Sequence, residues 1–331
     1  MVVNAGRIRR LAGYLLSLAI IFFLGRMLFL TWGQLTTSGI RFALDPARLT
    51  ASLVVLLLGG LLAVASWRQV VLGLGQQLSL TTALRAWFLS NLTRYIPGNV
   101  WQVASMLVIV ERAGVSRSVA LLSQVVYLMV ALSIAGLLGL TFLVARPELL
   151  ASAAALTWLR ALLSLPEAAM LGLVGLCALV FILSTPAFYR LATALTGRLT
   201  RRQFASSVPG LARGLLPPLL SVSSWLVNGV AFYVFVSALI DVPLDWLFPL
   251  VLINAGAYFV GYVSFITPSG LGFREGALAL MLSIYFPTPV AVALALVARL
   301  WSTASELLGA VLVYQLCHPE APVHGAGASR P

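Results

Sequence analysis

Apolar residues run along the chain in long blocks that are separated by short polar stretches. A helix that crosses a bilayer needs about 20 mostly apolar residues, and six blocks reach this length. These blocks are Leu11 to Thr31, Thr50 to Leu72, Val119 to Ala145, Ala168 to Tyr189, Leu215 to Ile240 and Val290 to Leu316. The pattern predicts six full membrane-spanning helices.

Two further apolar stretches, residues 83–112 and 246–286, are interrupted near their middle by proline and glycine. Proline removes a backbone donor and glycine permits a sharp turn, so one helix ends and another begins at each break. We expect two helical hairpins, the second of which resumes near Arg274. The pattern does not distinguish a hairpin that re-enters the membrane from one that crosses it fully.

The order of spans and hairpin in the first half recurs in the second half when Pro97 is aligned with Pro268. Each half has an odd number of full crossings, so the second copy would insert upside down, as in many transporters. We predict an all-α polytopic membrane protein with two inverted repeats, at about residues 1–146 and 166–317. One transmembrane domain then covers residues 1–317, and the small and polar residues 318–331 form a disordered cytoplasmic tail.

Composition excludes a water-soluble domain, because 61% of the residues are hydrophobic and 9% are charged, against about 25% charged in soluble domains. The net charge of +12 comes from arginines in short loops beside apolar blocks. Such placement favours anionic lipid headgroups over nucleic acid as partners. If both interrupted stretches are hairpins, the main arginine clusters fall on one side, which predicts cytoplasmic N and C termini. All 21 basic residues are arginine, a codon bias that points to a GC-rich bacterial genome and so to a bacterial cytoplasmic membrane.

Metal and cofactor chemistry has no support in the sequence. Cys177 and Cys317 are the only cysteines, and their spacing is not that of metal ligands. We expect no cofactor and no metal site.

The two breaks carry the candidate chemistry. Irregular backbone at membrane depth is tolerated where it lines a wet cavity, and the free amides of a helix N-terminus attract anions. Two such tips meeting from opposite leaflets would form a polar site for a phosphate headgroup. Two ordinary hairpins with turns outside the membrane are the alternative.

Ionisable residues favour the site, because a charge within hydrocarbon costs at least about 2.5 to 3.5 kcal/mol. Arg299 and Glu306 are seven residues apart and share one face of the last span, where an interhelical ion pair is the alternative role. Gln124 and Tyr127 could also face the site, although interhelical hydrogen bonds explain them equally well.

The candidate headgroup-binding residues come from both hairpins and the last span. They are Arg94, Pro97, Gly98, Asn99, Trp101, Gln102, Arg112, Pro268, Ser269, Gly270, Gly272, Arg274, Glu275, Arg299 and Glu306. Trp101 as an interfacial anchor and Arg112 in a solvated pair with Glu111 are the alternatives for those two residues.

The segments Arg94 to Trp101, Glu111 to Gly114 and Pro268 to Gly276 resemble the lysylphosphatidylglycerol synthase transmembrane family. The resemblance covers most of the chain. In that family the membrane region is similar to a lipid flippase module, which precedes a soluble aminoacyl-transferase domain in the multiple peptide resistance factor. The resemblance therefore implies the translocation half alone, as a standalone member. Gln124 stands where many relatives are expected to have an acidic residue, which weakens a proton-coupled role for that span.

The leading hypothesis is a flippase-like protein that binds and translocates an anionic or phosphate-linked lipid. An integral membrane transferase with Glu275 or Glu306 as general base is one alternative. A non-transporting accessory subunit of a lipid or glycolipid synthesis pathway is another. The expected partners are a membrane lipid with an anionic headgroup, a separate synthase or glycosyltransferase, and a second copy of the chain.

Overall fold

The computed structural model describes residues 42–93, 101–146, 166–200, 210–264 and 272–317, together with Arg26, Phe29 and Gly270. All regular elements in these residues are helices, so the all-α fold class is confirmed for this part of the chain. The first predicted span lies almost wholly outside the described residues, and the predicted tail 318–331 lies outside them entirely.

Five described stretches are long and apolar enough to cross a membrane. They are α3 (Pro46–Gly73), α6 (Arg117–Ala145), α11 with α12 (Leu211–Gly214 and Leu216–Ser237), η2 with α13 (Leu244–Trp246 and Leu247–Val263), and α15 (Thr288–Leu316). Four of them confirm predicted spans. The fifth, η2 with α13, is the first arm of the second predicted hairpin.

The fourth predicted span is bent in the structure, and it counts as a sixth candidate crossing if the bent pair is taken as one span. The chain forms α9 (Pro166–Ser184) and α10 (Pro186–Thr200), which are bent by 63° at Thr185. Pro186 explains the break, because its ring restricts the residue before it and removes a helical N–H. Pro186 within this apolar block indicates the bend, but the length of the block alone suggests one continuous span.

The described parts of three helices beside the predicted breaks are short. The hairpin arms α4 (Leu80–Thr93) and α5 (Trp101–Arg112) have 14 and 12 residues, and α14 (Phe273–Leu282) has 10. At about 1.5 Å per residue these described parts extend roughly 21, 18 and 15 Å, and residues 94–100 between α4 and α5 lie outside the described residues.

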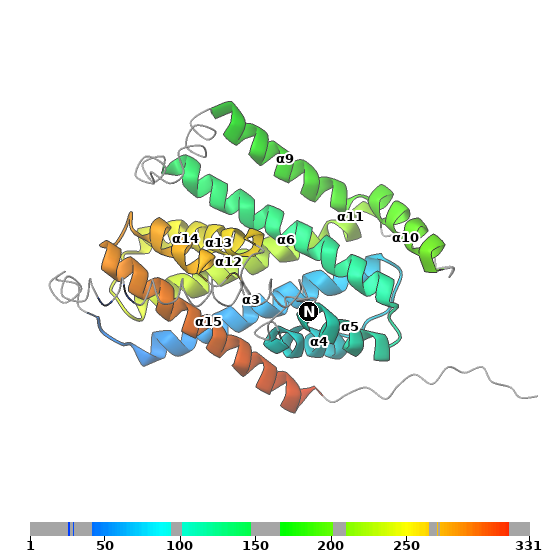
Figure 1. Cartoon of the computed structure of the whole chain (residues 1–331), viewed down its shortest axis with the longest axis horizontal. Coiled ribbons are helices and arrows are strands. Elements are labelled where there is room, and N and C mark those ends of the chain that lie inside the picture. The colour runs from blue at the N-terminus through cyan, green and yellow to red at the C-terminus, as the bar shows by residue number, and fades with distance from the viewer. Residues whose placement is uncertain are drawn as a thin grey trace, which may run out of the picture.

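The long helices α3 and α12 pack along each other at the centre of the bundle. Hydrogen bonds from the amides of Ala43 and Asp45 to the carbonyls of Leu239 and Ala238 place the start of α3 beside the end of α12, so the two helices are antiparallel. Around this pair, α6 packs on α13 and α15 packs on α4 (Figure 1). The helix α9 lies against α6 on the outside.

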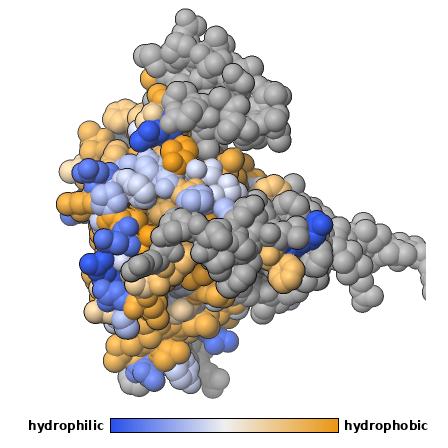
Figure 2. All heavy atoms as spheres, turned by 90° about the vertical axis from the view of Figure 1, so that its left-hand side faces the viewer, coloured by the Kyte–Doolittle hydropathy of each residue, from blue (hydrophilic) through white to orange (hydrophobic). Residues whose placement is uncertain are grey.

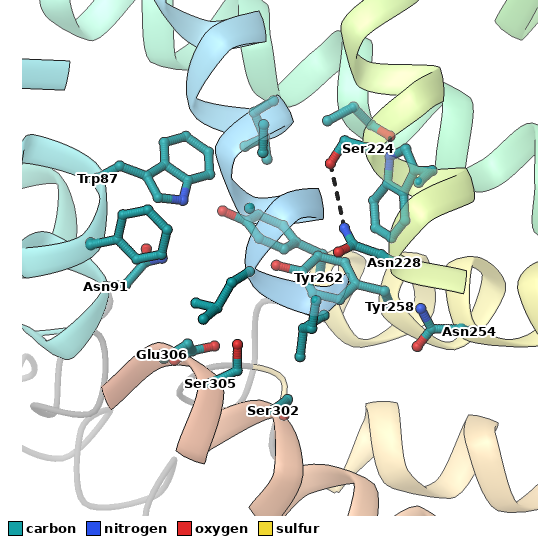
Figure 3. Close-up of a pocket in the computed structure, with 18 of the residues that line it drawn as sticks. Trp87, Asn91, Ser224, Asn228, Asn254, Tyr258, Tyr262, Ser302, Ser305 and Glu306 are labelled. Atoms are coloured by element: carbon teal, nitrogen blue, oxygen red, sulfur yellow. Dashed lines mark hydrogen bonds between the residues drawn. The ribbon is translucent and has the colours of Figure 1, made fainter. Parts of the chain in front are cut away.

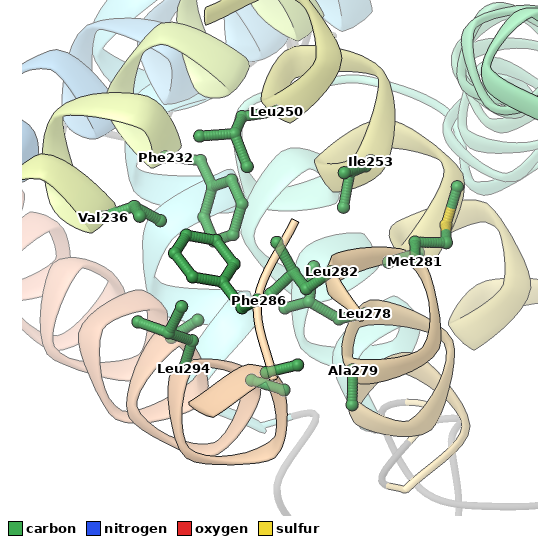
Figure 4. Packing of buried hydrophobic residues seen from close by; sticks show 14 of the residues in the cluster. Phe232, Val236, Leu250, Ile253, Leu278, Ala279, Met281, Leu282, Phe286 and Leu294 are labelled. Carbon is green, nitrogen blue, oxygen red and sulfur yellow. The ribbon is translucent and has the colours of Figure 1, made fainter. Parts of the chain in front are cut away.

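Apolar side chains of α12, α13, α14 and α15 interlock in one large buried cluster (Figure 4). Phe232, Leu250, Leu282 and Leu294 are almost fully buried there. Lipid tails are as apolar as these side chains, so close packing, more than removal from water, holds the helices together. Two glycines bring the backbones of α6 and α13 close together, because a Cβ at Gly139 would lie 2.7 Å from the Gly256 Cα.

The two hairpins start from opposite ends of the bundle. At one end, the Arg85 guanidinium at the start of α4 donates to the carbonyl of Cys317 at the end of α15. At the other end, the rings of Trp246 before α13 and Tyr285 after α14 are in edge contact, 5.0 Å apart. Figure 2 looks at this second end, where hydrophilic residues gather beside apolar ones. Asp45 and Arg48 form an exposed ion pair at the start of α3 there, with a 3.3 Å separation.

Candidate functional site

Eight helices enclose a cavity of about 180 Å³, which we call the central cavity. It lies between the first-half helices α3, α4, α5 and α6 and the second-half helices α12, α13, α14 and α15. Its polar lining residues are Asn91, Gln102, Gln124, Tyr127, Ser224, Asn228, Asn254, Tyr258, Tyr262, Arg274, Ser302, Ser305 and Glu306. Figure 3 shows Trp87 and Asn91 on one side of this space, Ser305 and Glu306 on another, and the tyrosines between them and Asn228.

Residues on both sides of each break line the central cavity. Asn91 near the end of α4 and Gln102 near the start of α5 both reach it, and the Gln102 amide donates to Asn91 Oδ1 at 2.7 Å. Tyr262 near the end of α13 and Arg274 at the start of α14 reach it from the second hairpin. The tips themselves, residues 94–100, 265–269 and 271, lie outside the described residues. The flanks of the two breaks thus meet at one polar space, while the predicted meeting of the tips themselves stays a prediction.

The turn before α14 aims Arg274 into the cavity. Gly270 and Gly272 adopt φ values of +65° and +87°, which side chains other than glycine rarely tolerate. Gly272 caps α14, so Arg274 falls in the first turn of the helix. Its guanidinium lies over the ring of Tyr258, 5.2 Å from the ring centre, and this contact orients the charge within an aromatic wall.

Glu275 faces away from the cavity lining and has two contacts behind it. Its Oε2 accepts from the Gly272 amide at 2.6 Å, which satisfies one of the free amides at the helix start. Its Oε1 lies 3.6 Å from Nη1 of Arg299 on α15, and the two side chains are 5% and 12% exposed. This buried ion pair joins α14 to α15.

Two buried amide oxygens at the cavity have no hydrogen-bond partner among the described residues: Oε1 of Gln124 and Oδ1 of Asn228. The Asn228 Nδ2 donates to Ser224 Oγ at 3.4 Å, and that hydroxyl donates to the carbonyl of Gly59 at 2.8 Å. Buried acceptors normally have a donor. Oδ1 of Asn228 packs against Gly59, so this atom lies in the contact between α12 and α3.

Aromatic rings form the remaining walls. Trp87 and Tyr127 meet edge to face with centres 5.1 Å apart, and Tyr258 stacks on Tyr262 at 6.0 Å. The indole N–H of Trp225 donates to the carbonyl of Ala131 at 3.0 Å, so its polar end has a partner within the protein. The rings therefore present apolar surface to the cavity beside the amides.

The structure places the predicted site residues in four positions. Gln102, Arg274 and Glu306 line the cavity, while Gly270 and Gly272 shape the turn beside it and Glu275 and Arg299 pair behind it. Trp101 is 45% exposed and Arg112 lies exposed at the far end of α5, and neither is in the lining. Arg94, Pro97, Gly98, Asn99, Pro268 and Ser269 lie outside the described residues.

Sequence reasoning missed much of the lining. Asn228 and Asn254 stand inside apolar helices, and Trp87, Tyr258 and Ser305 lie near them in the cavity. Polar side chains within spans are costly and face the bundle interior. A search of the apolar blocks for uncharged amides, and not only for charges, would have found both asparagines.

The lining suits binding of a polar group more than metal chemistry. Within the described residues, no three His, Cys, Asp or Glu side chains lie close enough together to hold a metal ion. The charged lining residues are Arg274 and Glu306, and the other polar ones are amides and hydroxyls. One arginine and one glutamate among neutral hydrogen-bonding groups can hold a polar headgroup whose phosphate meets the arginine.

Comparison with known proteins gave one family. The family model described as "Lysylphosphatidylglycerol synthase TM region" matches residues 10–309. Searches of curated proteins and of solved structures each gave no match.

Proposed function

Since the chain belongs to the lysylphosphatidylglycerol synthase TM region family, we propose that it binds the headgroup of an anionic or phosphate-linked lipid in the central cavity and translocates it across the membrane. The chain is a multi-pass membrane protein with several apolar spans. The family is related to lipid modification or flipping. The proposal assigns the second of these roles to this chain.

The observation that carries the proposal is the polar cavity itself. Polar and charged groups from α4, α5, α6, α12, α13, α14 and α15 converge there, inside a bundle whose helices are otherwise apolar. Keeping such groups at membrane depth is costly and marks a pathway for a polar substrate. With a volume of about 180 Å³, the cavity suits a headgroup, while the acyl chains stay in the bilayer.

Arg274 is the residue we assign to the lipid phosphate. It is the cationic residue of the described lining, and it sits in the first turn of α14, where the helix dipole also favours an anion. A guanidinium matches a phosphate with two parallel hydrogen bonds. Its contact with the Tyr258 ring holds it in place for this role.

The packing supports a rocking movement of two inverted repeats. Exchanging α3 with α12, α4 with α13 and α6 with α15 maps the contact of α4 with α15 onto that of α13 with α6. The hairpins also start from opposite ends and reach the same cavity. In inverted-repeat transporters, one repeat tilts against the other and exposes a fixed site to each side in turn.

The proposal includes an orientation in the bacterial cytoplasmic membrane. Arg68, Arg85 and Arg117 lie at the end of the bundle where α3 ends and where α4 and α6 begin. Basic residues in short loops favour the cytoplasmic side. This end and both chain termini are accordingly assigned to the cytoplasm.

The test is lipid transfer in liposomes that contain the purified full chain and fluorescent anionic or zwitterionic lipids. Arg274→Gln keeps the apolar stem of the side chain and removes its charge. A lost charge-assisted hydrogen bond is worth about 1.5–3 kcal/mol, so transfer should fall roughly tenfold to a hundredfold. Arg213→Gln, at an exposed arginine of α11, is the matched control and should transfer like wild type.

Equal transfer by wild type and Arg274→Gln would contradict the assigned phosphate contact. No transfer by folded wild type would contradict translocation and would favour an accessory subunit or an enzyme. Circular dichroism and thermal unfolding of each variant establish that the comparison is made between folded proteins.

A further inference from the structure

We infer that α10 lies along the membrane surface, at the end of the bundle where α3 ends and α6 begins, and that its basic side binds the headgroups of anionic lipids. This surface is separate from the central cavity, so it adds an interaction that the proposed function does not include or require. Three features of the molecule support it: the bend before α10, the three different sides of this helix, and the charge of the segment that follows the bend.

The bend before α10 is a capped turn between two helices. Thr185 caps the start of α10, because its Oγ1 accepts from the amide of Phe188 at 3.2 Å. Gly214 on α11 lies so close to the carbonyl of Ser184 that an added Cβ would overlap it, which holds the end of α9 against α11. With 19 residues, α9 extends about 28 Å, close to the ~30 Å hydrocarbon core. The helix α9 is thus nearly long enough to cross alone, and α10, turned by 63°, is not needed for the crossing.

One side of α10 packs against the bundle. Tyr189 and Ala192, nearly one helical turn apart, are 1% and 5% exposed and belong to a buried cluster with residues of α3 and α6. A Cβ at Gly73, the last residue of α3, would lie 2.7 Å from the ring of Tyr189. Figure 1 shows α10 beyond α9, at the end of the bundle where α6 begins. These contacts hold α10 at the end that is assigned to the cytoplasm.

The other two sides of α10 are exposed and differ in character. Leu191 is 61% exposed, and Arg190 is exposed as well. At about 100° per residue, the side chains of Leu191, Arg190 and the buried pair point in three directions that are roughly 100–130° apart. A helix with a protein side, an apolar side and a basic side suits the boundary of a membrane, where the apolar side meets acyl chains and the basic side meets headgroups.

The charge of the segment that begins with α10 favours anionic headgroups. Its basic residues are Arg190, Arg198, Arg201, Arg202 and Arg213, and the sequence has no acidic residue between positions 190 and 213. Each basic residue near an anionic lipid surface strengthens the attraction about fivefold. A lipid with a net negative charge therefore matches this surface better than a zwitterionic one.

A depth measurement tests the location of α10. Ala187→Cys and Ala194→Cys place a fluorophore at two exposed positions on the same side of α10, about 10 Å apart along its axis. Both are made in a full-length chain that carries Cys177→Ala and Cys317→Ala, which remove the two native cysteines. Quenching by phosphatidylcholine brominated at different positions of its acyl chains gives the depth of each fluorophore in liposomes. Both should lie at the same shallow depth.

The native Cys177 is the matched control for depth, because it is exposed near the middle of α9. A fluorophore on Cys177 alone should lie deep in the hydrocarbon. If the fluorophores at positions 187 and 194 differ in depth by most of the axial distance between them, α10 continues across the membrane and the inference is overturned.

The lipid preference is measured at the fluorophore on position 194. Brominated phosphatidylglycerol should be enriched there about fivefold or more over brominated phosphatidylcholine at low salt, and high salt should reduce the enrichment. Arg190→Gln should lower the enrichment about fivefold. Arg48→Gln is the matched control, because Arg48 is an exposed arginine at the opposite end of the bundle. It should leave the enrichment unchanged.

Equal quenching by the two brominated lipids would overturn the anionic preference. An enrichment that Arg190→Gln leaves unchanged would overturn the role of the basic side of α10. Circular dichroism of each variant establishes that the compared proteins are folded. Lipid transfer that depends on Arg274 is a separate measurement, so either result leaves the proposed function standing.

Discussion

Glu275→Gln should destabilise the protein strongly, because it breaks a buried ion pair while keeping the shape of the side chain. The carboxylate lies 3.6 Å from Nη1 of Arg299, with the two side chains 5% and 12% exposed. Removing one partner of a buried pair costs about 3–5 kcal/mol, since it leaves the other charge uncompensated. The glutamine oxygen can still accept from the Gly272 amide, so the helix cap is retained.

The double variant Glu275→Gln with Arg299→Met should recover much of this loss. Once both charges are gone, no uncompensated ion remains between α14 and α15, and replacing a buried pair by neutral groups is often close to neutral. The two single losses should therefore exceed the double loss by about 0.5–3 kcal/mol of coupling. Thermal or denaturant unfolding in detergent, with all four proteins of the cycle, measures this coupling.

An exposed ion pair provides the matched control. Arg117 Nε lies only 2.8 Å from Glu111 Oε2, but the two side chains are 71% and 43% exposed. Exposed pairs contribute about 0–1 kcal/mol, so Glu111→Gln should cost little despite the shorter distance. A loss for Glu275→Gln no larger than for Glu111→Gln would refute the structural role of the buried pair.

The same double variant separates packing from headgroup binding. Glu275 and Arg299 lie behind the lining, so a folded double variant should keep lipid transfer. If it folds and loses transfer, the pair acts on the headgroup, which is the role that the sequence predicted for both residues.

Three further predictions concern packing and turns. Gly139→Val should lower the free energy of unfolding by about 1–3 kcal/mol, because a Cβ at this position meets the Gly256 backbone. Gly175→Val is the control and should not lower it, because the space around Gly175 is open. Thermal unfolding of both variants tests this prediction. Gly270→Ala should cost more than Gly114→Ala, because both glycines have positive φ but only at Gly270 would the added Cβ meet a carbonyl, that of Gly261. The difference in melting temperature between the two variants measures this contact. Trp301→Phe should lower the free energy of unfolding by about 1 kcal/mol, because it removes the 3.0 Å hydrogen bond to Ser52. Adding Ser52→Ala to this variant should lower it little further. A double-mutant cycle with non-additive losses checks this, and additive losses would contradict it.

The location of most helices could be predicted from the chain alone. The blocks that contain α3, α6, α12 and α15 were recognisable because a backbone in hydrocarbon must satisfy its hydrogen bonds within its own helix. The start of α14 at Phe273 was also predictable, since the glycines before it permit a turn that other residues resist. The bend at Thr185 was missed because block length was weighed above the proline that follows.

The composition of the site was decided by tertiary packing. Arg274 and Glu275 are neighbours in sequence, yet successive residues of a helix point about 100° apart, so Arg274 faces the cavity and Glu275 faces Arg299. The hydropathy of α14 does not show which of its faces points into the cavity, because that depends on where α13 and α15 lie. Arg112 shows the converse, a predicted site residue at the end of the first hairpin that is exposed and away from the lining.

By itself, the sequence determined that this is a membrane bundle with two proline-broken segments, because hydropathy and proline act on each segment locally. Only the tertiary structure decided that Asn91, Asn228, Asn254 and Ser305 share one cavity with Arg274. These residues are far apart in the chain, and each is an ordinary polar residue of its own helix. They become a site because the antiparallel packing of α3 with α12 brings the flanks of both breaks to the same depth between the two halves.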